Sequence, residues 1–169
     1  MKLHVGGNQV KEGWKLLNIQ ALPGVDFVGN ISDLSQFGDR SLEEVYASHV
    51  LEHVPQRAMM TTLAGIYRAL KPGGRFLVSV PNMDVLCRMF LRQDIDVHGR
   101  YEVMRMMFGG QVDTHDFHFF GWNFEILQHF FEESGFMRVE RVDSFGLFQD
   151  TSELRVIGEA ISLNVIASK

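Results

Sequence analysis

The sequence predicts an α/β fold with a mainly parallel sheet that closes in a C-terminal antiparallel hairpin. Two apolar runs, at residues 45–48 and 74–80, enclose a polar turn and a stretch with the three- and four-residue spacing of an amphipathic helix. This order favours two parallel strands joined by a crossover helix. Two later runs, at residues 137–145 and 162–168, are joined through residues 150–158 and are predicted as the closing antiparallel pair.

Three more strands are expected in the N-terminal part, because short apolar runs there end at glycine, proline or asparagine. These runs are residues 3–5, 16–19 and 25–29. Eight residues lie between Gly7 and Leu16, and five lie between Ile19 and Val25. A helical crossover needs about a dozen residues. The N-terminal helices are therefore predicted to be shortened or absent, and residues 33–44 are expected to form a loop.

Helices are predicted from apolar spacing and from end signals. Residues 56–70 carry one apolar face and end at a Pro-Gly-Gly sequence. The Met- and Phe-rich residues 83–108 are expected to form two helices outside the sheet, with a break near His98. Residues 123–134 are predicted to be helical, with Asn123 as the N-terminal cap. Part of the Met- and Phe-rich surface is expected to be exposed, which suggests a possible homodimer.

Length and composition favour a single domain over residues 1–169. The chain is 46% apolar and 22% charged, which is enough for one core. Its formal net charge of −5 leaves no basic surplus for a phosphate backbone, so no nucleic-acid partner is expected. No run of 18 apolar residues is present, so no membrane partner is expected. The lone Cys87 is interpreted as a buried residue in a reducing compartment, and the absence of a signal-peptide pattern favours a cytoplasmic location.

The middle of the chain resembles that of class I S-adenosylmethionine-dependent methyltransferases. In that family the turn after the fourth strand carries Leu-Glu-His, and the fifth strand follows Leu-Lys-Pro-Gly-Gly. Residues 51–53 and 70–74 have these sequences. Similarity to a family of small predicted methyltransferases extends over nearly the whole chain, at residues 3–8, 13–19, 47–53, 70–74, 109–111, 116–118 and 121–122. The resemblance implies a Rossmann-like domain, S-adenosylmethionine as cofactor, and a small-molecule or sugar-type acceptor.

The candidate cofactor site lies at the ends of the first four strands. Gly6 and Gly7 form a turn that allows close approach of a nucleoside, although a plain glycine turn is the alternative. The resemblance implies cofactor contacts from Gly6, Gly7, Asn18, Asn30, Ser48, His49, Leu51, Glu52 and His53. It places Ser48 and His49 near the sulfonium. For Glu52 and His53, capping and packing of the next helix is the alternative.

Three positions depart from the family pattern. The family's Gly-Cys-Gly is shortened to Gly6-Gly7, its ribose-binding Asp is Asn18, and the Asp after the third strand is Asn30. An amide offers one neutral acceptor oxygen in place of a carboxylate, a loss of about 1–3 kcal/mol in binding. We therefore expect micromolar or weaker affinity, and Asn18→Asp is predicted to tighten it. A degenerate, non-catalytic binding module is the first alternative function.

The densest polar cluster is residues 113–118, which lie among aromatic residues. Methyl transfer depends on alignment, and a base that removes the acceptor's proton adds rate. The candidate catalytic residues are His118, Asp116 and His115. A solvated loop is one alternative. Two imidazoles and two carboxylates within six residues also suit a metal ion, which gives a metal-dependent hydrolase as the second alternative function. No cysteine pair or second cluster supports this alternative, so no metal ligand is assigned.

Overall fold

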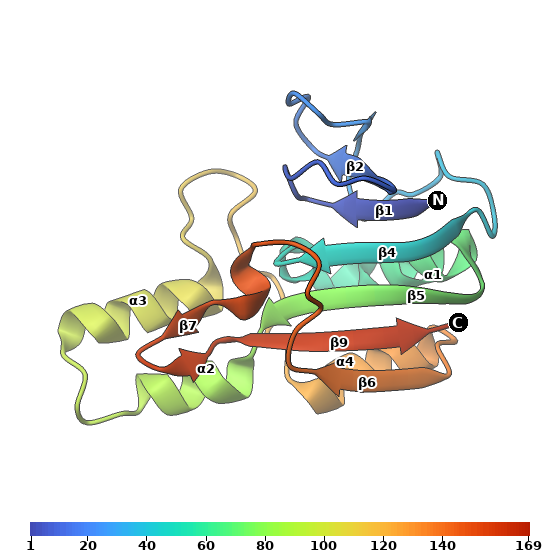
Figure 1. Ribbon diagram of the computed structural model, residues 1–169. Helices are drawn as coiled ribbons and strands as arrows, with labels where there is room; N and C mark the ends of the chain where they lie inside the picture. The colour runs from blue at the N-terminus through green and yellow to red at the C-terminus, as the bar shows by residue number, and fades with distance from the viewer.

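A seven-stranded sheet organises the chain, with the strand order β3-β2-β1-β4-β5-β9-β6. The computed structural model describes residues 1–169 (Figure 1). The strands are β1 (Lys2–Val5), β2 (Trp14–Asn18), β3 (Phe27–Val28), β4 (Leu42–Ser48), β5 (Leu70–Pro81), β6 (Arg138–Val142) and β9 (Ser162–Ser168), with β7 (Arg155–Val156) and β8 (Glu159–Ala160) in a separate hairpin. The strands from β1 to β5 pair in parallel. Strand β9 is antiparallel to both β5 and β6. The predicted α/β, Rossmann-like fold with a C-terminal antiparallel hairpin is confirmed.

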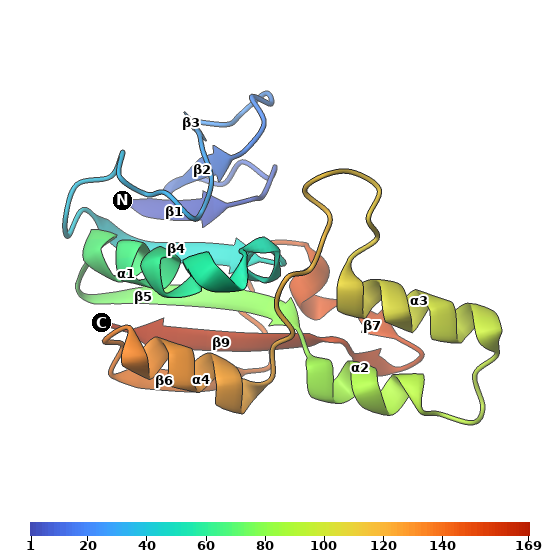
Figure 2. The same cartoon turned by 180° about the vertical axis from the view of Figure 1, so that it is seen from behind.

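Two helices cover one face of this sheet, as Figure 2 shows. The helices are α1 (Met59–Ala69), α2 (Met83–Phe90), α3 (Val97–Phe108) and α4 (Phe124–Glu133), with short 3₁₀ turns η1 (Leu51–His53), η2 (Gln56–Ala58) and η3 (Thr151–Glu153). Helices α1 and α4 pack on the sheet, and a cluster of 26 buried residues lies between these helices and the sheet. Leu63, Phe76 and Phe131 are fully buried there. Helices α2 and α3 lie beyond the sheet, as predicted.

The opposite face of the sheet has no α-helix on it (Figure 1). No α-helix precedes β4, so the prediction of shortened or absent N-terminal helices is confirmed. The segment between β6 and β9 crosses this face instead, and its Phe148 packs with Trp14, Tyr46 and Leu77. A loop therefore covers the face on which a helical crossover would otherwise lie.

The predicted break near His98 is wrong. Helix α2 ends at Phe90 and α3 begins at Val97, so His98 lies in the first turn of α3. The Asp96 side chain accepts a hydrogen bond of 2.8 Å from the Gly99 amide and caps this helix. A glycine in the first turn of a helix is compatible with such a cap.

Helix α2 turns its apolar stripe inward, onto α3 and the β8–β9 connection. Val85, Leu86 and Met89 are buried there with Ile161. Cys87 falls on the outward side and is exposed, so its interpretation as a buried residue is wrong. None of the helices has both the length and the apolar character that crossing a bilayer requires.

Candidate functional site

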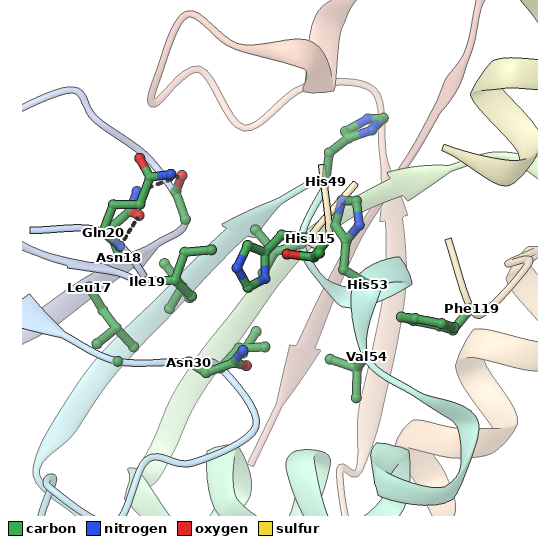
Figure 3. Close-up of a pocket in the computed structure, with 16 residues that line it drawn as sticks. Leu17, Asn18, Ile19, Gln20, Asn30, His49, His53, Val54, His115 and Phe119 are labelled. Atoms are coloured by element: carbon green, nitrogen blue, oxygen red, sulfur yellow. Dashed lines mark hydrogen bonds between the residues drawn. The ribbon is translucent and has the colours of Figure 1, made fainter. Parts of the chain in front are cut away.

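A pocket of about 380 Å³ opens at the carboxyl ends of β1, β2 and β4. Sixteen residues line it: Val5, Gly6, Leu17, Asn18, Ile19, Gln20, Gly29, Asn30, Ile31, His49, Val50, His53, Val54, Thr114, His115 and Phe119. Figure 3 shows Asn18 and Gln20 on one side, His49 and His53 on the other, and His115 between them. Ligands of open parallel sheets bind at this edge, because the strands end together and the loops diverge.

The turn after β1 is built so that its backbone forms part of the pocket wall. Gly6 has a left-handed φ of 79°, and its amide donates a hydrogen bond of 2.8 Å to the Leu17 carbonyl. A Cβ at Gly6 would overlap the Val50 side chain, and one at Gly7 would overlap the His4 ring. Neither position has room for a Cβ, so both require glycine, and Gly6 requires it also because of its left-handed φ.

Asn18 holds this short turn against the end of β2. Its amide nitrogen donates to the carbonyl oxygens of Gly6, at 3.2 Å, and Gly7, at 3.0 Å. Its side-chain oxygen accepts from the Gln20 amide at 3.0 Å. Only an amide satisfies two acceptors and one donor in this arrangement. The shortened glycine turn and the replacement of Asp by Asn are thus physically linked.

Asn18→Asp is therefore expected to destabilise the protein by about 1–3 kcal/mol, because a carboxylate would face two carbonyl oxygens that had lost their donor. The expectation from the sequence that the same substitution tightens cofactor binding concerns affinity and stays a separate prediction. Urea denaturation of both proteins measures the difference. Asn30→Asp is the matched control, because the Asn30 oxygen accepts from the Ser32 amide and a carboxylate accepts equally well. Equal stability of the Asn18 variant and the wild type would contradict this assignment.

A second pocket, of about 360 Å³, lies on the other side of the glycine turn and shares Gly6 and Asn18 with the first. Gly7 and Ser48 line this second pocket, not the first. Asp150 lies in its wall and accepts hydrogen bonds from Tyr46 Oη at 2.7 Å and Ser48 Oγ at 3.1 Å. Burial alone would raise the pKa of Asp150, but these hydrogen bonds and those from Ser152 lower it. Asp150 is thus an anchored carboxylate.

The turn after β4 sends consecutive side chains in different directions. His49 has a left-handed φ of 52° and lines the first pocket together with His53. Leu51 is fully buried in the main core and is not part of the pocket wall. Glu52 is also fully buried, beneath the pocket. Of these predicted cofactor contacts, the structure brings only the two histidines to the pocket surface.

The loop between α3 and α4 folds over the same edge, as Figure 2 shows. Backbone bonds fix it: the Phe119 amide donates to the Glu52 carbonyl at 2.8 Å, and the His118 amide donates to the Phe108 carbonyl at 3.1 Å. His115 lines the pocket with an exposed imidazole. The Asp116 carboxylate accepts from the Val112 amide and closes the loop on itself.

His118 lies behind His53, with the two ring centres 4.9 Å apart, and does not line the pocket. Burial lowers the pKa of His118, an effect that the nearby Glu52 charge opposes. Of the three candidate catalytic residues, His115 alone is on the pocket wall. The structure therefore separates residues that the sequence places within one short cluster.

Comparison with known proteins agrees with this geometry. Residues 4–78 match a family model described as a methyltransferase domain. No curated protein sequence matches the chain. Many solved structures match over 99% of it. The chain has the class I methyltransferase fold.

Three of these methyltransferases illustrate the likeness. An S-adenosylmethionine-dependent methyltransferase from Archaeoglobus fulgidus is 16% identical, with a TM-score of 0.61 and 85% of its chain covered. One from Thermotoga maritima is 18% identical, with a TM-score of 0.60 and 81% covered. The 1,6-didemethyltoxoflavin-N1-methyltransferase of Burkholderia thailandensis, solved with 1,6-didemethyltoxoflavin and S-adenosylhomocysteine, is 17% identical, with a TM-score of 0.62 and 70% covered.

The chain spans 61% of a possible exported protein from Bordetella parapertussis, 51% of a putative O-methyltransferase from Nostoc punctiforme and 47% of the CurJ carbon methyltransferase. The match of residues 4–78 to the methyltransferase-domain model supports the expected methyltransferase, and the Burkholderia thailandensis neighbour was solved with S-adenosylhomocysteine. Sequence reasoning missed Gln20, Thr114 and Asp150 at this edge of the sheet. Gln20 and Thr114 adjoin predicted residues, so the neighbouring motifs pointed to them. Asp150 lies in a segment without any recognisable motif, and only the fold brings it to Ser48.

Proposed function

We propose that this protein transfers a methyl group from S-adenosylmethionine to a small-molecule acceptor at the edge where β1, β2 and β4 end. The observation that carries the proposal is the shape of this edge. A glycine turn without room for side chains separates two pockets, and imidazoles face the larger one. When bound, S-adenosylmethionine supplies an electrophilic methyl group on a sulfonium sulfur.

The residues present fit this cofactor. The larger pocket, at about 380 Å³, has the size of a small-molecule site and contains the apolar side chains of Ile19 and Ile31 for a nucleobase. Asn18 Oδ1 has one lone pair left for a ribose hydroxyl, because the other accepts from Gln20. Across the glycine turn, the Asp150 carboxylate suits the ammonium group of the methionine part. The weakened ribose contact supports a modest affinity.

His115 is the best-placed general base. Its imidazole is exposed at the pocket and belongs to a loop that hydrogen bonds anchor to the η1 and η2 turns. An acceptor hydroxyl or amine bound beside it would lose its proton to this ring as the oxygen or nitrogen attacks the methyl carbon. His53, on the same side, donates from Nδ1 to the Phe117 carbonyl at 3.1 Å and so helps to hold this loop over the pocket.

The acceptor is proposed to be a small molecule with a nucleophilic oxygen or nitrogen. The neighbour from Burkholderia thailandensis is described as an N1-methyltransferase of a small heterocycle. The formal charge of −5 is unfavourable for nucleic acid. A cytoplasmic location is proposed because the lone Cys87 is an exposed free thiol. Exposed apolar residues on and beside α3, including Val97 and Tyr101, support the proposed homodimer.

Calorimetric titration of the purified protein with S-adenosylhomocysteine is expected to give one site with a micromolar or weaker dissociation constant. The affinity is expected to be low because the ribose carboxylate is missing. One site is expected because a single ligand molecule would span both pockets. Adenosine alone is expected to bind still more weakly, because it leaves Asp150 unpaired. The absence of both heat and thermal stabilisation at millimolar ligand would contradict the proposal and favour a non-catalytic module.

A further inference from the structure

Beneath the larger pocket lies a buried carboxylate without a hydrogen-bond partner. Glu52 is 0% exposed, and neither of its carboxylate oxygens has a hydrogen-bond partner. A charge in that position is costly unless a cation or donors compensate for it. Two imidazoles, those of His53 and His118, lie beside it, and one donor atom from each of the three residues falls within 4.8 Å of the other two.

The hydrogen bonds leave both imidazoles with a free lone pair. His53 Nδ1 lies 3.1 Å from the Phe117 carbonyl. Because a carbonyl only accepts, Nδ1 carries the proton and the lone pair of Nε2 is free. Histidines that bind metals characteristically donate their other ring N–H to a carbonyl in this way. His118 Nδ1 is buried and has no hydrogen-bond partner at all.

A third imidazole, that of His49, also lies beside Glu52. Ser162 Oγ donates to the Thr151 carbonyl at 2.8 Å, so it accepts from His49 Nε2, which lies 2.9 Å away. His49 Nδ1 lies 3.4 Å from Glu52 Oε1. This contact is longer than a normal ion-pair hydrogen bond, so it does not supply the hydrogen bond that the Glu52 carboxylate lacks.

We propose that Glu52, His53 and His118 bind a divalent transition-metal ion such as Zn²⁺. Two imidazoles and one carboxylate are a ligand set that zinc accepts while leaving a position open. Ligand atoms about 2.1 Å from a tetrahedral ion lie about 3.4 Å from one another, so modest side-chain rotations close the site. These residues are not the 113–118 cluster that the sequence suggested as ligands; only His118 is common to both.

The place of this site gives the ion a function that rests on the proposed methyl transfer. His53 belongs to both the metal site and the pocket wall, so an ion held by it would lie next to the proposed acceptor site. An ion there would bind an acceptor that carries a hydroxyl or carboxylate oxygen and would lower the pKa of that hydroxyl. It would also connect the η1 turn to the loop after α3, because Glu52 and His53 come from the turn and His118 comes from the loop.

The test is a calorimetric titration of chelator-treated full-length protein with ZnCl₂, without S-adenosylmethionine. One zinc per chain is expected. Glu52→Gln and His118→Ala are each expected to lower zinc affinity by about 100-fold or more, since even outer-shell changes cost 10–100-fold. His98→Ala is the matched control, because His98 is exposed on α3 and far from the cluster in sequence, and it is expected to leave the affinity unchanged.

Thermal unfolding of the metal-free proteins gives an independent result. Glu52→Gln removes a buried charge that no hydrogen bond stabilises, so we expect a higher melting temperature for metal-free Glu52→Gln than for the metal-free wild type. A wild type that takes up no zinc, with a Glu52→Gln variant of lower melting temperature, would overturn the proposal and assign Glu52 to an ion pair with His49. Titration of the metal-free protein with S-adenosylhomocysteine tests the cofactor site separately. Zinc uptake without cofactor binding would support the metal site but would contradict its proposed role in methyl transfer.

Discussion

Gly6→Ala is expected to weaken S-adenosylhomocysteine binding at least about 10-fold and to destabilise the protein by about 1–3 kcal/mol. The left-handed φ of 79° at Gly6 is costly for any residue with a Cβ. The added methyl group would also overlap the Val50 side chain, which forms part of the pocket wall. The substitution is therefore expected to shift both the Gly6 backbone and the Val50 side chain in the pocket wall. Titration calorimetry and urea denaturation measure the two effects.

Gly38→Ala is the matched control for this substitution. Gly38 does not have a left-handed φ, and a Cβ at this position would meet nothing within 4 Å. We expect its ligand affinity and stability to equal those of the wild type. If Gly6→Ala bound the ligand as tightly as Gly38→Ala, the glycine turn would not be part of the cofactor site.

The order of strands and helices follows from the sequence because each buried element is an apolar run of the right period. The first half of β4 shows where this reasoning fails. The strand begins at Leu42, but Glu44 interrupts the apolar run and is buried in ion pairs with Lys2, at 2.7 Å, and Arg75. A buried charge that is compensated by residues from two other strands leaves no local signal in the sequence.

The candidate site was predictable where a strand end alone determines the position of a side chain. Gly6 follows β1, Asn18 ends β2 and Asn30 lies two residues after β3, and all three line the larger pocket. Glu52 and Leu51 belong to the same motif as His53 but lie in the interior, because a tight 3₁₀ turn points successive side chains in different directions. A contiguous motif thus marks the location of a site without specifying which of its residues face the ligand.

Burial on the helix-free face of the sheet has a consequence for acid stability. His4 is 3% exposed, and its ring packs against Phe148 and Tyr46, with centres 4.0 and 5.1 Å apart. Burial lowers the pKa of His4 from 6.5 to about 4, although the charge of Asp150 opposes this. The His4 imidazole is thus neutral in the folded protein, and its Nδ1 has no hydrogen-bond partner.

Lowering the pH from 7 to 4.5 is expected to reduce the free energy of unfolding by about 2–3 kcal/mol through His4, at 1.36 kcal/mol per unit of pKa difference. The unfolded chain binds this proton near pH 6.5 and the folded chain only near pH 4. The stabilisation is therefore complete above pH 6.5 and is lost as the pH falls toward 4. The lowered pKa of His118 acts in the same direction.

His4→Phe isolates the contribution of this one histidine. Phenylalanine keeps the aromatic contacts with Phe148 and Tyr46 but cannot take up a proton, so we expect urea denaturation at pH 7 and pH 4.5 to show a loss about 2–3 kcal/mol smaller than in the wild type. His98→Phe, at an exposed position, is expected to keep the wild-type loss. Equal losses in the two variants would mean that His4 binds its proton equally well in the folded and unfolded chains, and that the loop carrying Phe148 leaves this face open to water.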